Sequence, residues 1–330
     1  MKKTKKKMGM VLSAAVLILA ACGGDESAST NTTESEDTKT FKIGVTQIVE
    51  HPSLNAAYEG FQKAIEDAGL EVEYEVKNAQ NDNSQNTTIA NDLVSSGVDL
   101  IFANSTPSAQ AVAALTEDIP IVFTSVTNAV DAEIVDSMES PGGNVTGTVD
   151  THPDAIPSTL AFLKNELGAK NVGIVFNAGE QNSRSQVDAV KEQMAEVGLN
   201  VVEASVSTSA EVKQATESLI GKVDSLYIIT DNTVVSALES VVDVANEQKL
   251  PMMVAEFDSV KRGGLGAYGF EFYDIGYEAG EMAVKILKGE STPAELPVQY
   301  PQNLKFVLNK DTVDALGIEV KDEWESEFAE

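Results

Sequence analysis

The 330-residue chain contains few of the residues that support covalent or metal-dependent chemistry. It has one cysteine, one tryptophan and two histidines. With a single cysteine there can be no internal disulfide, and neither His51 nor His152 has a cysteine or a second histidine at ligand spacing, so the sequence predicts no metal site. Stability must therefore come from buried apolar area. Hydrophobic residues make up 42% of the chain, which is enough for the cores of two ordinary domains.

Positive charge is also scarce, with 23 Lys and Arg residues against 52 Asp and Glu residues. Five of the lysines lie before residue 22, where there is no acidic residue. The rest of the chain therefore carries 18 basic and 52 acidic residues, a formal charge of 18 − 52 = −34. A surface this acidic repels phosphate backbones and anionic headgroups, so we expect no nucleic-acid partner and no membrane binding by charge.

The sequence also lacks the common catalytic and cofactor-binding motifs. No G-x-S-x-G, H-E-x-x-H or C-x-x-C pattern occurs. Residues 264–269 match the G-x-G-x-x-G pattern of dinucleotide sites, but that site needs a strand, a turn and a helix in order, and an extended segment is predicted to follow the glycines. Gly221 and Lys222 lack the rest of a phosphate-binding loop. We therefore expect no cofactor and no enzymatic activity.

The N-terminus has no apolar run long enough to span a bilayer. Five lysines among residues 2–7 precede a short apolar segment, residues 8–21, which indicates a secretory signal rather than an anchor helix. Cys22 stands directly behind Leu-Ala-Ala, which resembles a bacterial lipobox. The resemblance implies removal of residues 1–21, lipidation of Cys22 and attachment to the outer face of the plasma membrane. The alternative is an incidental cysteine beside an export signal.

Residues 22–40 are predicted to form a flexible tether. They contain no large apolar side chain and are rich in Ser, Thr, Asp and Glu. Such a segment cannot bury enough surface to offset the entropy of ordering it. The tether would hold a folded body away from the membrane.

Two halves of the remaining chain resemble each other. The segment 43–46 (IGVT) corresponds to 172–175 (VGIV), and 68–70 corresponds to 197–199 at the same offset of 129 residues. Farther on, the turn that ends at Thr106 corresponds to the one that ends at Asp231. Small changes in offset fall in predicted loops, where insertions are tolerated. The repetition indicates two similar lobes.

Within each half, short apolar strands alternate with helical patterns. The expected strands cover residues 41–47, 72–77, 100–103, 121–124 and 144–150, then 172–176, 201–206, 226–229 and 252–255. Strands that are apolar on both faces suit a parallel sheet covered by helices. The predicted fold class is therefore α/β, with two doubly wound, Rossmann-like lobes of the type I periplasmic-binding-protein kind.

The pattern of elements in the later part of the sequence predicts that the chain crosses between the lobes three times. After the strand 144–150, residues 268–288 are expected to form a strand and a long helix, and residues 297–308 extended segments. This organisation predicts a hinge of three crossover strands. We assign residues 41–150 and 258–298 to the N-terminal lobe, and residues 151–257 and 299–330 to the C-terminal lobe.

In open α/β sheets, ligands bind beyond the carboxyl ends of the strands. Two such lobes facing each other would place these ends on both sides of one cleft. Polar residues that directly follow strands are therefore the candidates for ligand binding. They are Gln47, Glu50, His51, Ser105, Thr106, Ser125, Thr127, Asn177, Asn182, Thr230, Asp231, Asn232 and Asp258.

The paired turns differ in charge, because a hydroxyl on one side corresponds to a carboxylate on the other. This pairing suits a zwitterion, whose carboxylate would bind near Thr106 and Ser125 and whose ammonium would bind Asp231, with Asp258 as a second acidic residue. The alternative is that Thr106 and Asp231 only cap their own helices. His51 is interpreted as a wall of the cleft rather than a catalyst.

The repeated lobes carry six segments that resemble those of one family. They are residues 46–52 (TQIVEHP), 103–110 (ANSTPSAQ), 120–127 (PIVFTSVT), 141–147 (PGGNVTG), 230–234 (TDNTV) and 257–260 (FDSV). With the lipobox and the tether, the chain resembles a type I solute-binding lipoprotein of a bacterial ABC importer, in the subfamily of tryptophan- and other aromatic-amino-acid-binding proteins. The resemblance implies a monomer that clamps an amino acid between its lobes and delivers it to a membrane permease with a separate ATPase.

The residues themselves leave the side chain of the ligand open. L-Tryptophan is the first expectation, followed by phenylalanine or tyrosine, while a branched-chain amino acid, a nucleoside or a sugar are alternatives. A receptor that senses the ligand without transport is another. The aromatic residues Phe123, Phe176, Tyr268 and Phe270 lie on predicted strands and are expected in the core, and Trp324 lies in the acidic C-terminal tail.

Overall fold

The computed structural model describes residues 39–329. The predicted signal segment, Cys22 and the tether up to residue 38 lie outside this range. Within residues 39–329, no helix has the length and apolar character needed to cross a bilayer.

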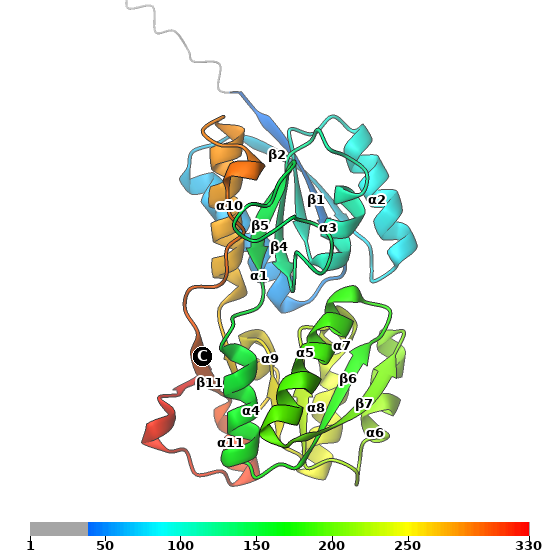
Figure 1. The fold of residues 1–330 in the computed structure, drawn as a ribbon, viewed down its shortest axis with the longest axis vertical. Helices are drawn as coiled ribbons and strands as arrows, with labels where there is room; N and C mark the ends of the chain where they lie inside the picture. Colours follow the sequence, from blue (N-terminus) through cyan, green and yellow to red (C-terminus); the bar gives the residue numbers. More distant parts are fainter. Residues whose placement is uncertain (1–38, 330) are drawn as a thin grey trace, which may run out of the picture. The chain divides into compact units, whose positions relative to one another are not determined.

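The first lobe is built on a five-stranded sheet in the order β2-β1-β3-β4-β5, in which all strands are parallel. Helices cover both faces of this sheet (Figure 1). Its elements are β1 (Phe41–Gln47), α1 (Pro52–Asp67), β2 (Val72–Asn78), α2 (Asn83–Ser95), β3 (Leu100–Asn104), α3 (Thr106–Ala113), β4 (Ile121–Val126), β5 (Val145–Val149), α10 (Phe272–Leu287) and η2 (Pro293–Glu295).

Two hydrophobic clusters hold these layers together. One joins the sheet to α2 and α3 through residues such as Leu93, Ile101 and Phe123. The other joins the opposite face to α1 and α10 through residues such as Phe61 and Met282. Strands that carry apolar side chains on both faces produce this three-layer arrangement.

Helices α1 and α10 pack against each other although 200 residues separate them in the chain. Glycines make this close approach possible, because a Cβ atom on Gly60 or Gly276 would collide with the backbone of the facing helix. Helix α10 is thereby fixed to the first lobe.

The second lobe is built on a seven-stranded sheet in the order β12-β11-β10-β9-β8-β6-β7. Only the pairing of β10 with β11 is antiparallel. Its elements are α4 (Ala155–Asn165), β6 (Asn171–Asn177), α5 (Gln181–Val197), β7 (Asn200–Val206), η1 (Ser209–Glu211), α6 (Val212–Glu217), β8 (Ser225–Ile228), α7 (Asn232–Ser236), α8 (Leu238–Gln248), β9 (Met252–Val254), α9 (Phe257–Lys261), β10 (Gly266–Gly269), β11 (Lys305–Leu308), α11 (Lys310–Leu316), η3 (Asp322–Trp324) and β12 (Glu327–Phe328).

The chain passes between the two sheets at residues 150–154, 270–271 and 296–304 (Figure 1). The second passage differs from the sequence assignment, which gave residues 258–298 to the first lobe. Helix α9 follows β9, and β10 pairs with β9 and β11, so this part of the chain belongs to the second sheet. The return to the first lobe begins near residue 270. Because β10 forms the last four residues of the residue 264–269 glycine pattern, that pattern is not a nucleotide-binding turn.

Candidate functional site

The two lobes contact each other through the carboxyl ends of their strands. Ser53 Oγ, in the first turn of α1, donates a buried hydrogen bond of 2.6 Å to Glu256 Oε2, which caps α9. Asn81 Nδ2 donates to Thr233 Oγ1 at 2.7 Å. Ser185 Oγ donates to an exposed Asp131 carboxylate at 2.9 Å. Ser53 and Glu256 also line a small space between the lobes.

This space is a small cavity between the lobes. Its free volume is about 10 Å³, roughly the space that one water molecule needs. Helices α1, α7 and α9 all begin beside it. The lining residues are His51, Ser53, Leu54, Asp150, Thr230, Asp231, Asn232, Val235, Glu256 and Phe272.

Asp231 is completely buried and is held by its own lobe. It caps α7 by accepting from the backbone N–H of Val234 at 2.7 Å, and its other oxygen accepts from the Asn177 N–H at 2.6 Å and from Ser183 Oγ at 2.7 Å. Burial, together with the nearby charge of Glu180, raises the pKa of Asp231 to about 7. The capping role considered for Asp231 is therefore present, and the residue also lines the cavity.

Glu180 organises the same end of the second lobe. Its buried carboxylate accepts from both the backbone and the side chain of Asn232 and of Thr233, at distances between 2.6 and 3.3 Å. The Asn177 side chain, which donates to Thr233 Oγ1 at 2.8 Å, adds a longer bond to Glu180. This network fixes the start of α7.

His51 belongs to the first lobe, on the other side of the cavity from Glu180, and caps α1. Its Nδ1 accepts from the Leu54 N–H at 3.5 Å, and its ring also contacts the Asn232 side chain of the second lobe. Burial, with a smaller contribution from Arg262, lowers the pKa of His51 to about 3. A neutral imidazole is therefore part of the cavity wall at neutral pH.

Asp150 lies where the chain first leaves the first lobe. Its N–H donates to the Val126 carbonyl at 3.0 Å, which holds it beside the end of β4. The side chain is 7% exposed, and its Oδ1 has no hydrogen-bond partner. Burial raises the pKa of this carboxyl to about 7, partly opposed by the hydroxyls of Thr127 and Thr230. Sequence reasoning placed the strand that precedes Asp150 but did not select this residue.

The remaining predicted residues of the first lobe are not among those that line the cavity. Thr106 Oγ1 accepts from the Thr127 N–H at 3.2 Å and therefore ties α3 to β4 rather than capping its own helix. Gln47 is bound by Asn55 and Asn104. Glu50 is exposed to solvent.

Two serines at this end have strained backbones. Ser105, the residue before α3, has a φ of 111°, and Ser125, near the end of β4, has a φ of 55°. Non-glycine residues rarely adopt such angles, and they cluster at functional sites where the surroundings hold them. The Oγ of Ser125 is buried without a partner.

The predicted residues of the second lobe divide in the same way. Thr230, Asp231 and Asn232 line the cavity. Asn182 is buried and donates to the Thr230 carbonyl at 3.2 Å, while its Oδ1 has no partner. Asp258 is partly exposed in the first turn of α9 and is not among the lining residues.

Sequence reasoning missed the other lining residues, which are Ser53, Leu54, Asp150, Val235, Glu256 and Phe272. Signals for two of them existed, because Asp150 is the last residue of a predicted strand and Glu256 directly follows another. Phe123 and Phe176 are buried in the sheet cores, and Tyr268 stacks on Phe306. The aromatic ring that reaches the cavity is Phe272.

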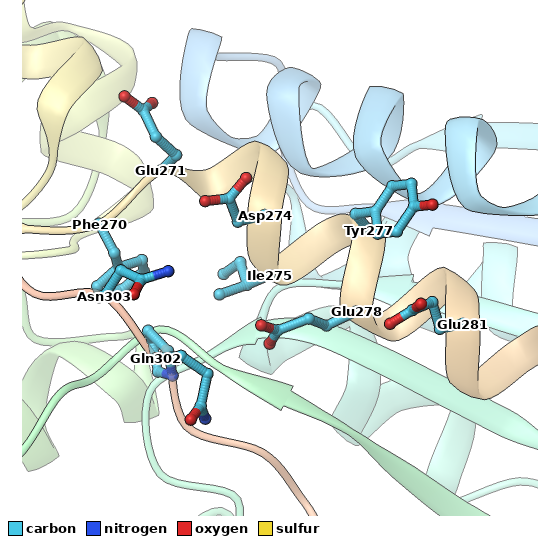
Figure 2. Close-up of a pocket in the computed structure, with 10 residues that line it drawn as sticks. Phe270, Glu271, Asp274, Ile275, Tyr277, Glu278, Glu281, Gln302 and Asn303 are labelled. Atoms are coloured by element: carbon cyan, nitrogen blue, oxygen red, sulfur yellow. The ribbon is translucent and has the colours of Figure 1, made fainter.

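A larger hollow of about 270 Å³ lies beside the crossings (Figure 2). Glu271, Asp274, Glu278 and Glu281 follow one another along the chain entering and forming α10, opposite Gln302 and Asn303. Burial, with the charges of Asp274 and Glu281, raises the pKa of Glu278 to about 7. Among the residues that the structure describes, no group of three or more His, Cys, Asp or Glu side chains is placed to hold a metal ion. We assign the functional site to the smaller cavity, because both lobes and three helix N-termini meet there.

Comparison with known proteins agrees with this architecture. A model of the family described as ABC transporter substrate binding protein matches residues 42–328. The chain is 42% identical to the tyrosine-binding protein of Clostridioides difficile (strain R20291) over 326 residues, which covers 96% of this chain and 94% of that protein.

Two solved structures show the fold in different states. An ABC domain from Streptococcus pneumonia in complex with L-Trp has a TM-score of 0.82 at 32% identity, covering 87% of this chain and 97% of that one. A ligand-free, open substrate-binding protein with adhesive properties from Clostridium difficile has a TM-score of 0.66 at 42% identity, covering 87% and 98%. The lobe arrangement here is thus nearer to the ligand-bound structure, although the open one is closer in sequence.

The predicted fold, two parallel α/β lobes of the type I periplasmic-binding-protein kind, is confirmed, and so is the expectation that the chain is not an enzyme, since its relatives are binding proteins. The chain belongs to the ABC transporter substrate-binding protein family.

Proposed function

We propose that this protein is an extracytoplasmic substrate-binding lipoprotein of an ABC importer. It binds an aromatic amino acid between its lobes, L-tryptophan first and then phenylalanine or tyrosine, and delivers it to the permease. The observation that carries the proposal is the group of buried acidic residues and apolar side chains from both lobes that meet around this small cavity. Relatives that bind tyrosine and L-Trp support the same class of ligand.

The cavity offers a partner for each part of an amino acid. Leu54, Val235 and Phe272 supply apolar surface for a side chain. Buried carboxyl groups suit the ammonium. The first-lobe residues Thr106 and Ser125, at the start of α3 and the end of β4, are proposed to face the ligand's carboxylate. Two or three charge-assisted hydrogen bonds with a buried side chain are enough for micromolar affinity, about −8 kcal/mol.

Binding is proposed to act by closing the lobes. A ligand that contacts both lobes only in the closed state shifts the population toward that state. The three passages between the lobes provide the hinge. The closed form can then be distinguished by the permease from the empty, open form.

Calorimetric titration of the purified full chain tests the ligand. L-Tryptophan, L-tyrosine, L-phenylalanine, L-leucine and ribose are titrated separately at pH 8. We expect micromolar or tighter binding for at least one aromatic amino acid and at least tenfold weaker binding for leucine and ribose. Tighter binding of leucine or ribose, or binding of none of the aromatic amino acids, would overturn the proposal.

A second experiment tests the anchor. The wild-type chain and a Cys22→Ser variant are expressed in a bacterium supplied with a labelled fatty acid. We expect label and membrane association only for the wild type, because the cysteine thiol is the proposed attachment point. Equal membrane association of both forms would show that Cys22 is not an anchor.

A further inference from the structure

Three carboxyl groups line the ligand cavity, and they differ in how many of their hydrogen bonds are already made. They are Asp150, Asp231 and Glu256, each of which is less than a tenth exposed. A buried carboxylate oxygen without a donor is unfavourable, so the number of free positions indicates which group a bound ammonium would complete.

Asp231 and Glu256 are already provided with donors from the protein. Asp231 accepts three hydrogen bonds, all from its own lobe. Glu256 accepts from Ser53 Oγ on one oxygen, and from the Ser259 N–H and Oγ on the other. Both groups therefore hold helices and lobes in place, and neither needs a ligand to complete it.

Asp150 differs because Oδ1 receives no hydrogen bond at all. The residue is fixed through its backbone to the end of β4, and its side chain lines the cavity. Thr127 of the first lobe and Thr230 of the second both face the carboxyl group. A primary ammonium carries three donors and would complete this acceptor.

We propose that Asp150 receives the α-ammonium group of the ligand and so makes a free amine a requirement for tight binding. The inference rests on the proposed amino-acid function and assigns one of its contacts. Because Asp150 lies on the first passage between the lobes and faces hydroxyls of both, an ion pair formed there also links ligand binding to closure.

An ion pair at Asp150 would make ligand affinity depend on pH. Burial raises the pKa of Asp150 to about 7, so below that value the carboxyl carries a proton and cannot form the ion pair. The other titratable groups that line the cavity are His51 on α1, Asp231 on α7 and Glu256 on α9. His51 is neutral through this range, because its pKa is lowered to about 3. Affinity should therefore rise with pH from 5.5 to 8.

The experiment compares Asp150→Asn with Asp154→Asn. Asp154 belongs to the same passage, is exposed and makes no capping hydrogen bond, so it is the matched control. Each protein is titrated with L-tryptophan and with indole-3-propionate, which has the same ring and carboxylate but no amine. We expect Asp150→Asn to weaken L-tryptophan binding by between about tenfold and a hundredfold and to change indole-3-propionate binding less than about threefold.

If the wild type prefers tyrosine, 4-hydroxyphenylpropionate replaces the indole acid. Equal losses for the amino acid and its amine-free analogue would assign Asp150 a structural role and overturn the inference. Unchanged L-tryptophan affinity would overturn it as well. If the wild type binds no amino acid, the proposed function itself is overturned, and not only the role of Asp150.

The pH profile separates Asp150 from Asp231, whose pKa is also raised to about 7. Between pH 8 and pH 5.5 the ionised fraction of such a group falls about thirtyfold, and wild-type affinity for the amino acid should fall by a similar factor. The profile should become flat in Asp150→Asn and stay steep in Asp231→Asn. If Asp150→Asn does not fold, a wild-type profile that is equally steep for the amine-free analogue would contradict the inference.

Discussion

The two lobes have similar topologies but treat their buried polar groups differently. In the second lobe, Glu180 and Asp231 receive at least three hydrogen bonds each from their surroundings. At the corresponding end of the first lobe, Ser125 Oγ and Asn104 Oδ1 are buried without partners, and the adjoining crossing leaves Asp150 Oδ1 in the same condition. Gln181 Oε1 and Asn182 Oδ1, at the start of α5, are exceptions in the second lobe.

Backbone geometry follows the same division. The positive φ angles at Ser105 and Ser125 both occur at strand ends of the first lobe, whereas residues 177 and 231 of the second lobe have none. Strain and unpaired polar atoms both cost stability, and they persist where function uses them. The comparison indicates that the second lobe provides a rigid support for helix N-termini, while the first lobe and its crossing keep acceptors and donors free for a ligand.

The largest effect should follow from breaking the network of the second lobe. Glu180→Ala removes the acceptor for Asn232 and Thr233 and leaves several buried donors unpaired. We expect a loss of about 3 kcal/mol or more in the free energy of unfolding, measured by thermal and urea denaturation.

Glu192→Ala is its control, since Glu192 is an exposed acidic residue on the same helix, α5. That change should stay within about 0.5 kcal/mol of the wild type. Similar stabilities of both variants would show that the hydrogen bonds around Glu180 are not what supports this lobe.

A smaller effect is expected from the contact between the lobes. Ser53→Ala removes the buried hydrogen bond to Glu256. A hydrogen bond to a charged group contributes about 1.5–3 kcal/mol, so the closed state should be less populated and the apparent affinity for the amino acid should fall at least about tenfold. Small-angle scattering of the ligand-free variant should show a larger radius of gyration than that of the wild type.

Ser185→Ala is the control for Ser53→Ala, because it removes a hydrogen bond between the lobes at an exposed position. Its hydroxyl also crosses between the lobes, to Asp131, but the pair is exposed to solvent. Exposed polar pairs contribute little, so affinity and radius of gyration should both stay near the wild-type values. If Ser53→Ala behaves like Ser185→Ala, the hydrogen bond between Ser53 and Glu256 does not stabilise the closed state.

The sequence was sufficient to predict most strands of the two sheets to within about two residues, because apolar runs that suit a parallel sheet are easy to recognise. Strand β10 was assigned to the wrong lobe, since four residues after a glycine-rich turn do not reveal which sheet they join. The rule that ligands bind beyond strand ends correctly pointed to turns such as Thr230–Asn232, which line the cavity.

What the sequence could not show was which acidic group already has partners. Asp231 was expected either to bind the ammonium or to cap its helix, and the sequence did not reveal its other donors, Asn177 and Ser183, which lie about 50 residues away in the chain. Asp150 looked like the end of a strand because nothing local marks its unpartnered oxygen. Hydrogen-bond satisfaction depends on tertiary contacts, and only the folded structure supplies them.

The smallest effect, and the sharpest contrast between the lobes, should come from one buried serine in each. Ser125→Ala in the first lobe removes a hydroxyl that has no partner, so the free energy of unfolding should stay the same or rise slightly. Ser225→Ala in the second lobe removes a hydroxyl that donates to the Pro251 carbonyl at 2.9 Å, so stability should fall by about 1 kcal/mol.

Ligand affinity should respond in the opposite order. If the Ser125 hydroxyl is kept free for the carboxylate of the amino acid, its removal should weaken binding about fivefold. Ser225→Ala should leave binding unchanged, because Ser225 opens β8 and the cavity-lining residues Thr230–Asn232 follow the other end of that strand. Calorimetric titration and thermal unfolding of both variants measure the two quantities together. A loss of stability without a loss of affinity in Ser125→Ala would mean that the hydroxyl supports the fold, and the division of roles between the lobes would fail at this residue.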